Sequence, residues 1–200
     1  KSDRVQFEYA DLADGKSVAE LFDRLQTRWS RLDVLVNNAG TTHLPALLED
    51  VSEKDFDKVF AVNAKSVYYT SKFAVPWMKQ QAAGAIVNIA STAALSPRPH
   101  LTWYNASKGW MVTATKSMAI ELASERIRVN AICPVAGETP LLASFMGSDT
   151  PETREKFLSS IPLGRFSTPK DIAATALYLA SDEAAMITGV ALEVDGGRCI

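Results

Sequence analysis

Short apolar runs rich in β-branched residues alternate with long amphipathic segments, and this alternation limits the fold more than any other feature of the chain. Strands are predicted at 4–10, 32–40, 85–91, 126–134 and 190–197. Helices are predicted at 15–30, 52–81, 103–125, 151–160 and 168–182. Because continuous apolar strands separated by helices are typical of a parallel sheet covered on both faces, one α/β domain spanning 1–200 is expected. The helix at 52–81 is expected to kink or break at Pro76.

The composition is that of an ordinary globular protein and excludes several function classes. Hydrophobic residues make up 47% of the 200, and the formal net charge of −2 argues against electrostatic binding to nucleic acid. No apolar run reaches the roughly 18 residues of a membrane span, and the first residues contain no secretory signal. The two cysteines, Cys133 and Cys199, form neither a metal-binding motif nor a disulfide framework. A cytoplasmic protein without a bound metal is therefore expected.

Chemistry is expected where the strands end, because ligands of open α/β sheets bind beyond the carboxyl ends of the strands. Small and polar residues gather there: Asp11–Leu12, Asn37–Gly40, Ser91 and Pro134–Thr139. The segment Asn37–Gly40 suits close approach of a ligand to the backbone, although ordinary turn chemistry explains it equally well.

Tyr104 and Lys108 give the sharper signal, because residues four apart share one face of a helix. The same stripe continues through Met111 and Thr115, which predicts that the pair faces inward near the mouth of the sheet. A buried ammonium beside a phenol favours phenolate, so Lys108 is expected to lower the pKa of Tyr104. Such a phenol would serve as a general acid or base near neutral pH.

Two further polar residues stand out, each with a structural alternative. Asn63 interrupts an apolar helical stripe, where it would hold a water, or satisfy a helix bulge. Ser91 ends a strand, where it would bind a substrate oxygen or cap the next turn. A serine hydrolase is disfavoured, because no G-x-S-x-G motif surrounds Ser91 and the two histidines, His43 and His100, lack a recognisable partner pattern.

Taken together, these residues resemble the classical short-chain dehydrogenases/reductases. The matching motifs, in order, are NNAG at 37–40, VNAKS around Asn63, IVNIAST around Ser91, YNASK at 104–108 and RVNAICP at 128–134. Ser91 lies 13 residues before Tyr104, and Asn63 lies 28 before Ser91, as in the family. The resemblance extends over essentially the whole chain and implies a Rossmann-like, doubly wound parallel sheet.

The resemblance also implies roles for individual residues. Tyr104 would exchange a proton with the substrate oxygen, Lys108 would lower its pKa and hold the nicotinamide ribose, Ser91 would bind the substrate oxygen, and Asn63 would anchor a proton-relay water. The cofactor, NAD or NADP, would contact residues from several strand ends. These are Asp11 and Leu12 beside the adenine, Asn38, Ala39 and Gly40 beside its ribose, and Pro134, Gly137 and Thr139, the last two beside the carboxamide.

Two departures from the family pattern affect these expectations. Val135 stands where the family usually has a glycine, so the loop after Pro134 loses backbone freedom. The glycine-rich turn that cradles the pyrophosphate is absent, and the family topology would place two strands before residue 1. Because those strands would separate 4–10 from 32–40 in the sheet, 4–10 would have no neighbour within this chain. The sequence is therefore interpreted as an incomplete record of a longer protein that lacks its first two strands.

The leading functional hypothesis is an NAD(P)-dependent oxidoreductase that transfers a hydride between nicotinamide and a carbonyl or secondary alcohol. Two alternatives are a truncated or degenerate non-catalytic subunit and a 3-oxoacyl-carrier-protein reductase, for which Arg126 and Arg128 are too few to form a docking patch. Residues 135–167 are expected to form a substrate lid. Its candidate apolar walls are Leu141, Leu142, Phe145, Met146 and Phe157.

A homodimer or homotetramer is expected, because two predicted helices are apolar or small on more than one face. The residues concerned are Val67, Tyr68, Phe73 and Trp77 on one helix, and Ala106, Gly109, Trp110 and Thr113 on the other. The partner for catalysis would be a small-molecule alcohol or carbonyl compound, and neither nucleic acid nor membrane is expected to bind.

Overall fold

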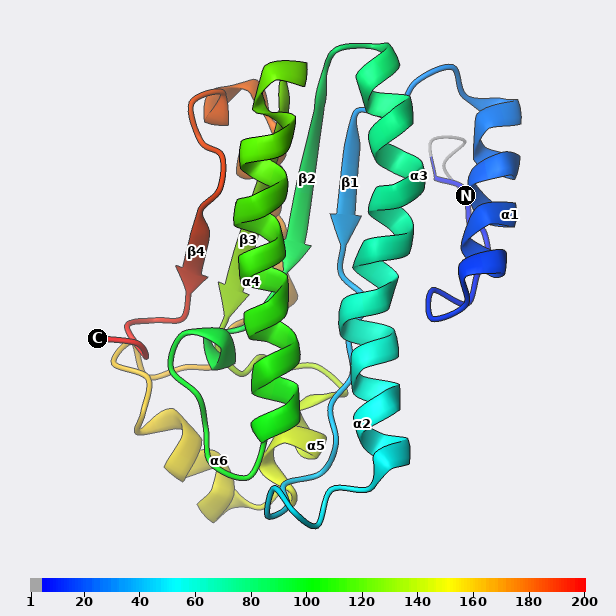
Figure 1. The fold of residues 1–200 in the computed structure, drawn as a ribbon. Coiled ribbons are helices and arrows are strands. Elements are labelled where there is room, and N and C mark those ends of the chain that lie inside the picture. The colour runs from blue at the N-terminus through cyan, green and yellow to red at the C-terminus, as the bar shows by residue number, and fades with distance from the viewer. Residues whose placement is uncertain (1–4) are drawn as a thin grey trace.

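The computed structural model describes residues 5–200 (Figure 1). Within these residues four strands alternate with helices, at four of the five positions that the periodicity predicts. The strands are β1 (Val34–Asn37), β2 (Gly84–Ile89), β3 (Ile127–Pro134) and β4 (Ala191–Val194). The helices are α1 (Gly15–Arg28), α2 (Glu53–Phe60), α3 (Ser66–Gln80), α4 (Thr102–Leu122), α5 (Leu142–Met146), α6 (Pro151–Leu158) and α7 (Pro169–Ala180). No helix within 5–200 is both long and apolar enough to cross a membrane.

The strands form one fully parallel sheet in the order β1-β2-β3-β4. Helices α3 and α4 cover one face (Figure 1), and α7 packs on β2, β3 and β4 from the other. Helices on both faces of a parallel sheet confirm the predicted doubly wound α/β fold. Because every strand runs in the same direction, the carboxyl ends of all four lie along one edge of the sheet.

The core is built from strand residues that alternate between the two faces of the sheet. Ile86 and Val129 are buried against Met78 and Leu122, which come from α3 and α4. Val87, which follows Ile86, and Ile132, which lies three residues after Val129, point to the other face, where they join Leu179 of α7 in a separate cluster. Both faces of the central strands are therefore apolar, as the continuous hydrophobic runs predict.

The predicted strand at 4–10 does not form over residues 5–10. Residue 4 lies outside the described residues. Val5, Phe7 and Tyr9 are exposed, although their alternation is typical of a strand. An extended segment becomes a strand only by hydrogen bonding to a neighbour, and within 5–200 no strand lies beside this segment or beyond the outer edge of β1. The segment is instead joined to α1 by a salt bridge between Glu8 and Arg24 at 3.1 Å.

The expected break at Pro76 is wrong, because α3 continues through this residue to Gln80. Trp77 and Met78 follow Pro76 directly and are buried in the core, so packing holds the helix together across the hydrogen bond that proline cannot donate. The interruption lies earlier, where residues 61–65 form a π-helical turn between α2 and α3.

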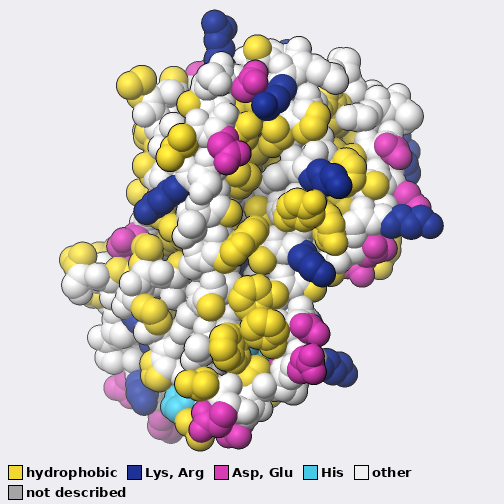
Figure 2. Space-filling model, in the orientation of Figure 1, with side chains coloured by type: hydrophobic (Ala, Val, Ile, Leu, Met, Phe, Trp, Pro, Cys, Tyr) yellow, Lys and Arg dark blue, Asp and Glu magenta, His cyan; other side chains and the backbone are white. Residues whose placement is uncertain are grey.

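The outer faces of α3 and α4 differ in part from the expectation. Val67 and Trp77 are buried in the core rather than on an outer surface. Tyr68 and Trp110 are exposed, and Ala106 and Thr113 are exposed beside them on α4. Figure 2 shows hydrophobic side chains distributed over the face formed by these two helices.

Candidate active site

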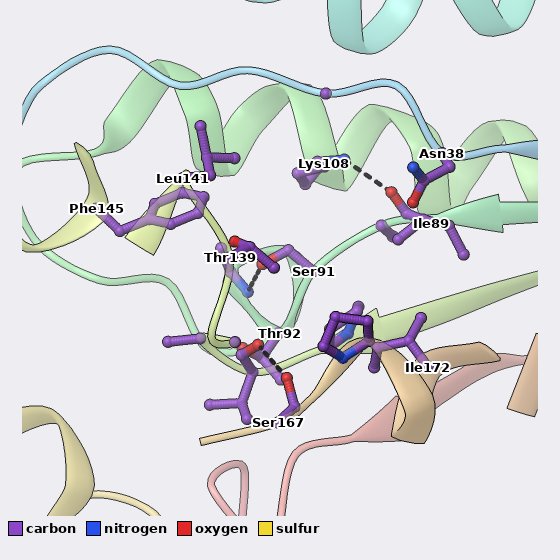
Figure 3. A pocket seen from close by; sticks show the side chains of 18 of the residues that line it. Asn38, Ile89, Ser91, Thr92, Lys108, Thr139, Leu141, Phe145, Ser167 and Ile172 are labelled. Atoms are coloured by element: carbon purple, nitrogen blue, oxygen red, sulfur yellow. Dashed lines mark hydrogen bonds between the residues drawn. The ribbon is translucent and has the colours of Figure 1, made fainter. Parts of the chain in front are cut away.

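A cavity of about 710 Å³ opens at the carboxyl ends of the strands. It brings together most of the residues singled out in the sequence (Figure 3). Those that line it are Asn38 and Gly40 after β1, Ser91 after β2, Pro134, Gly137 and Thr139 from the end of β3 onward, and Tyr104 and Lys108 from α4. These residues are up to 101 positions apart, and they meet because parallel strands end at one edge.

Tyr104 lies in the first turn of α4 and is almost completely buried. Its ring packs edge-on against Phe145, with the ring centroids 5.0 Å apart. Burial raises the pKa of Tyr104 to about 12, while a hydrogen bond with Ser91 acts in the opposite direction. The expected lowering of this pKa by Lys108 is therefore not found, because loss of water around the phenolate outweighs the favourable contacts.

Lys108 lies one helical turn after Tyr104 and is likewise buried. Its Nζ donates a hydrogen bond of 2.7 Å to the carbonyl oxygen of Ile89, at the end of β2 (Figure 3). Burial lowers the pKa of Lys108 to about 8. The ammonium is thus committed to a main-chain carbonyl rather than to the phenol, which explains why it does not lower the pKa of Tyr104.

The structure shows the capping role of Ser91, and its substrate-binding role stays a prediction. Its Oγ accepts a hydrogen bond of 3.1 Å from the Ala93 amide and so caps the short helical turn Thr92–Ala94. The same side chain lines the cavity and interacts with Tyr104. A capping serine is therefore also within reach of an oxygen atom bound in the cavity.

Asn63 lies in the π-helical turn and is fully buried, but it does not line the cavity. Its Oδ1 accepts from the Thr41 amide at 2.8 Å, and its Nδ2 donates to the Thr41 carbonyl and to Ser107 Oγ, both at 2.9 Å. The amide thereby ties the loop after β1 to α4. This arrangement matches the helix-bulge alternative for Asn63.

Gly40 lies close to both Lys108 and Asn63. A Cβ atom at this position would lie 3.4 Å from Lys108 Nζ and 3.7 Å from Asn63 Oδ1, which is ordinary van der Waals contact. Because Gly40 has no side chain, its backbone is open to the cavity that it lines.

Three predicted cofactor contacts lie outside the main cavity. Leu12 and Ala39 line a second, smaller cavity of about 250 Å³, which they share with Asn38. Asp11 lines neither cavity. Its carboxylate accepts from the Ala13 amide at 2.9 Å, so the structure places it in the turn before α1.

The segment 135–167 forms one side of the main cavity. Leu141, Phe145 and Phe157 line it as expected. Leu142 and Met146 do not, because they are buried within the segment's own apolar cluster beside Val135, Ile161 and Phe166. Helix α5 was not expected from the sequence, because a helix of five residues is too short to show periodicity.

Sequence reasoning missed two polar residues of this region. Ser107 hydrogen-bonds Asn63, and Arg98 lines the cavity from the loop before α4. A polar residue on the buried side of α4 was a signal for Ser107. No sequence signal pointed to Arg98, because it lies in an irregular loop where side chains follow no periodic pattern.

A group of metal-binding residue types lies outside the cavity. Side-chain ligand atoms of Glu193, Asp195 and Cys199 lie within 4.8 Å of one another. The Asp195 carboxylate already accepts hydrogen bonds from the Gly197 and Cys199 amides, each at 2.8 Å. These contacts explain the arrangement as a structured turn after β4.

Known proteins match the chain along nearly its whole length. Residues 2–198 match the family model described as Enoyl-(Acyl carrier protein) reductase. The 4-formylbenzenesulfonate dehydrogenase TsaC1/TsaC2 of Comamonas testosteroni is 53% identical over 172 residues, which cover 84% of this chain and 68% of that protein. The chain belongs to the short-chain dehydrogenase/reductase family.

Solved structures of this family share the fold. The 3-ketoacyl-(acyl-carrier-protein) reductase from Brucella melitensis, complexed with NADH, superposes with a TM-score of 0.90 at 46% identity, covering 96% of this chain and 77% of that one. ElxO with NADP bound gives a TM-score of 0.90 at 32% identity, with coverage of 96% and 77%. The predicted enzyme class of this short-chain dehydrogenase/reductase, an NAD(P)-dependent oxidoreductase acting on CH–OH or C=O groups, is confirmed.

Proposed function

We propose that the protein reduces a carbonyl compound, or oxidises the corresponding alcohol, in the cavity at the carboxyl ends of the sheet, with Tyr104 as the proton-exchanging residue. The observation that supports this most directly is the convergence of Ser91, from the end of β2, with Tyr104 and Lys108, both from α4, on one cavity. A non-catalytic subunit would have no need to keep a buried phenol and a buried ammonium side by side, since burial disfavours both charged forms.

The residues around the cavity fit a dinucleotide cofactor. Lys108 presents a buried cation, and Gly40 exposes backbone beside it without a side chain in the way. We assign Lys108 to the nicotinamide ribose, with Asn38, Pro134, Gly137 and Thr139 as further contacts. The adenine end of the cofactor would lie toward Leu12 and Ala39, which line the second cavity. Asp11, which lines neither cavity, would lie on the same side. When bound, the cofactor supplies the hydride or accepts it.

Tyr104 would donate its phenolic proton to the substrate oxygen during carbonyl reduction, and take a proton back during alcohol oxidation. Because the pKa of Tyr104 is raised to about 12, the phenol holds its proton at neutral pH, which is the form needed to donate to a carbonyl oxygen. A pKa nearer the working pH would make it a stronger acid. Ser91 would hydrogen-bond the same oxygen and hold it beside the phenol. Asn63 acts as a positioning residue, because it holds the Thr41 loop against α4; the relay-water role remains part of the proposal.

Apolar side chains shape the part of the cavity that would take the substrate. Leu101, Leu141, Phe145 and Phe157 line it, which suits an aromatic body. The relative from Comamonas is named for an aromatic aldehyde, and we propose aryl aldehydes or the corresponding alcohols as the substrate class. Docking of an acyl-carrier protein is less favoured, because Arg128 is occupied by the main-chain carbonyls of Leu179 and Ser181, at 2.6 and 2.9 Å.

Three broader features belong to the same proposal. Residues 135–167 act as a lid, since they cover one side of the cavity with α5 and α6. Two or four copies associate through the outer faces of α3 and α4. The compartment is the cytoplasm, where the free thiols of Cys133 and Cys199 would stay reduced.

Transfer of deuterium would test this function directly. The protein is incubated with NADH or NADPH deuterated at C4 and with a panel of aryl aldehydes, and the alcohols are analysed by mass spectrometry. We expect one deuterium on the carbinol carbon. Cofactor binding without any transfer to the panel would instead support the non-catalytic alternative.

A further inference from the structure

Arg98 places a second positive charge at the main cavity, on the side where the proposed substrate would bind. It lies in the loop between the short helical turn 92–94 and α4, and its side chain is half-buried. The guanidinium lies over the ring of Phe157, 4.3 Å from the ring centroid. Its Nη2 donates a hydrogen bond of 3.1 Å to Ser160 Oγ, so two residues of α6 and the turn after it hold Arg98 in place.

Among the described residues, no acidic side chain forms a salt bridge with Arg98. Within residues 5–200, no carboxylate lies within 4.0 Å of the Arg98 guanidinium. None of the residues that line the cavity is Asp or Glu, whereas both Arg98 and Lys108 are cationic. A half-buried charge without a partner is costly, so an anion bound in the cavity would be favoured.

A second arginine lies near Arg98 but does not line the cavity. Arg198 donates to Ser96 Oγ at 2.8 Å, and its Nε is buried without a hydrogen-bond partner. Burial and the charge of Arg198 together lower the pKa of Arg98 to about 10, which leaves Arg98 charged at neutral pH. An arginine that stays charged at the cavity wall can donate paired hydrogen bonds to a carboxylate or sulfonate.

We propose that Arg98 binds an anionic group of the substrate, and that the substrate is an aryl aldehyde or alcohol with a carboxylate or sulfonate at the end away from the reacting carbon. The phenol and the guanidinium each lie against an aromatic ring of the same cavity. Phe145 contacts Tyr104, Phe157 contacts Arg98, and all four residues line the cavity, so an aromatic body bound there would meet rings beside both polar groups. This inference rests on the proposed function and adds the charge of its substrate.

A purely structural role for Arg98 makes a different prediction. If its function were only to fasten α6 to the loop through Ser160 and Phe157, its loss would disturb the cavity for every substrate alike. The comparison must therefore be between two substrates of the same shape, one charged and one neutral.

The experiment compares 4-formylbenzoate with its neutral isostere 4-formylbenzamide, using NADH or NADPH and the Arg98→Gln variant. We expect the parent protein to prefer the carboxylate, and the variant to lose about 10- to 100-fold in kcat/KM for it, mainly through KM. The value for the amide should change less than about threefold, and Arg98→Lys should restore part of the preference. Arg31→Gln, an exposed arginine that bonds Asp33, is the matched control.

Binding is measured separately, by calorimetric titration of the protein loaded with oxidised cofactor, where neither aldehyde can be reduced. An equal loss for both compounds in Arg98→Gln, or no preference in the parent protein, would overturn the anion site. If neither aldehyde is turned over, the proposed aryl-aldehyde function is wrong, and the titration still decides the anion site: preference for the carboxylate that requires Arg98 supports it, and its absence overturns it.

Discussion

Tyr104 and Lys108 show how burial, rather than their mutual proximity, sets the charge of the candidate site. Burial raises the pKa of the phenol to about 12 and lowers that of the ammonium to about 8. Both shifts favour the neutral form, as expected when a charged group loses water. Buried ionisable groups lower the stability of the fold and are retained where the reaction of a site requires them. A variant at Tyr104 measures the contribution of the phenol to turnover, and a variant at Lys108 measures the cost of the buried ammonium to stability.

Replacing Tyr104 with Phe should remove most turnover while leaving the fold intact. Only the hydroxyl is lost, and the ring still packs against Phe145. General acid–base groups contribute about 10²- to 10⁴-fold, so we expect kcat to fall by that order with nearly unchanged cofactor affinity. Steady-state kinetics and a cofactor titration measure the two quantities. A variant that retains kcat within a few-fold of the parent would show that Tyr104 is not the proton donor.

Replacing Lys108 with Met should weaken cofactor binding yet stabilise the free protein at neutral pH. The pKa of Lys108 is about 8 in the folded protein, against an ordinary value of 10.5. Below pH 8 the folded parent therefore holds a buried ammonium, which lowers its free energy of unfolding. Lys108→Met removes this cost but also removes the hydrogen bond to Ile89, so we expect a net gain in stability on the order of 1–3 kcal/mol.

The size of this stability gain depends on pH, and the gain disappears over a defined window. As pH rises from 8 to 10.5, the folded parent releases the proton before the unfolded chain does, and its disadvantage disappears. Urea denaturation at pH 7 and pH 10 should show a stability gain for Lys108→Met only at the lower pH. Equal stability at pH 7 together with unchanged cofactor affinity would show that Lys108 neither destabilises the fold nor binds the cofactor.

At the scale of elements, the π-helical turn 61–65 joins the helical layer to the loop after β1. Its residue Asn63 uses both ends of its amide, toward the Thr41 backbone and toward Ser107 of α4. The turn therefore holds the loop that contains Gly40, which lines the main cavity. The position of the loop after β1 thus depends on a bulge in a helix as well as on the strand that precedes it.

Asn63→Ala should destabilise the protein and loosen this loop. The Thr41 amide and carbonyl would lose their partner in a buried setting, which costs about 1–3 kcal/mol for each unsatisfied group. Urea denaturation measures the loss, and KM for the cofactor should rise. Ser107→Ala is the control, because it removes only one of the three hydrogen bonds; a similar loss for both variants would show that the contacts to Thr41 are unimportant.

The whole molecule presents an apolar outer face on α3 and α4 (Figure 2). Tyr68 is 53% exposed, Trp110 39% and Ile120 81%. No atom lies within 4 Å of a Cβ built at Gly109, so the surface beside Trp110 is open to a second copy. Exposed aromatic and aliphatic side chains of this kind are characteristic of association surfaces.

Trp110→Glu should convert the proposed dimer or tetramer into smaller species. A charge placed on the apolar face would be buried without a partner on association, which opposes assembly. Size-exclusion chromatography with light scattering at micromolar concentration measures the mass. Leu47→Glu, an exposed apolar residue in the loop before α2, is the matched control. A parent protein that is monomeric under these conditions would contradict the proposed assembly.

The sequence by itself determined the order of strands and helices, the parallel α/β class and the convergence of Ser91, Tyr104 and Lys108. These follow from local periodicity and from the rule that parallel strands end at one edge. The same reasoning located Asn63 and Gly40, because a polar or tiny residue within a regular pattern is visible without knowing its neighbours.

Only the tertiary structure decided what depends on neighbours distant in the chain. Residues 5–10 have strand-like alternation but no strand beside them, so they stay irregular. The pKa of Tyr104 rises because burial removes water, while the nearby ammonium bonds Ile89 instead. The position of the Arg98 guanidinium at the cavity is likewise set by its packing against Phe157. Desolvation and hydrogen-bond partners are properties of the folded surroundings, and no local pattern of residues encodes them.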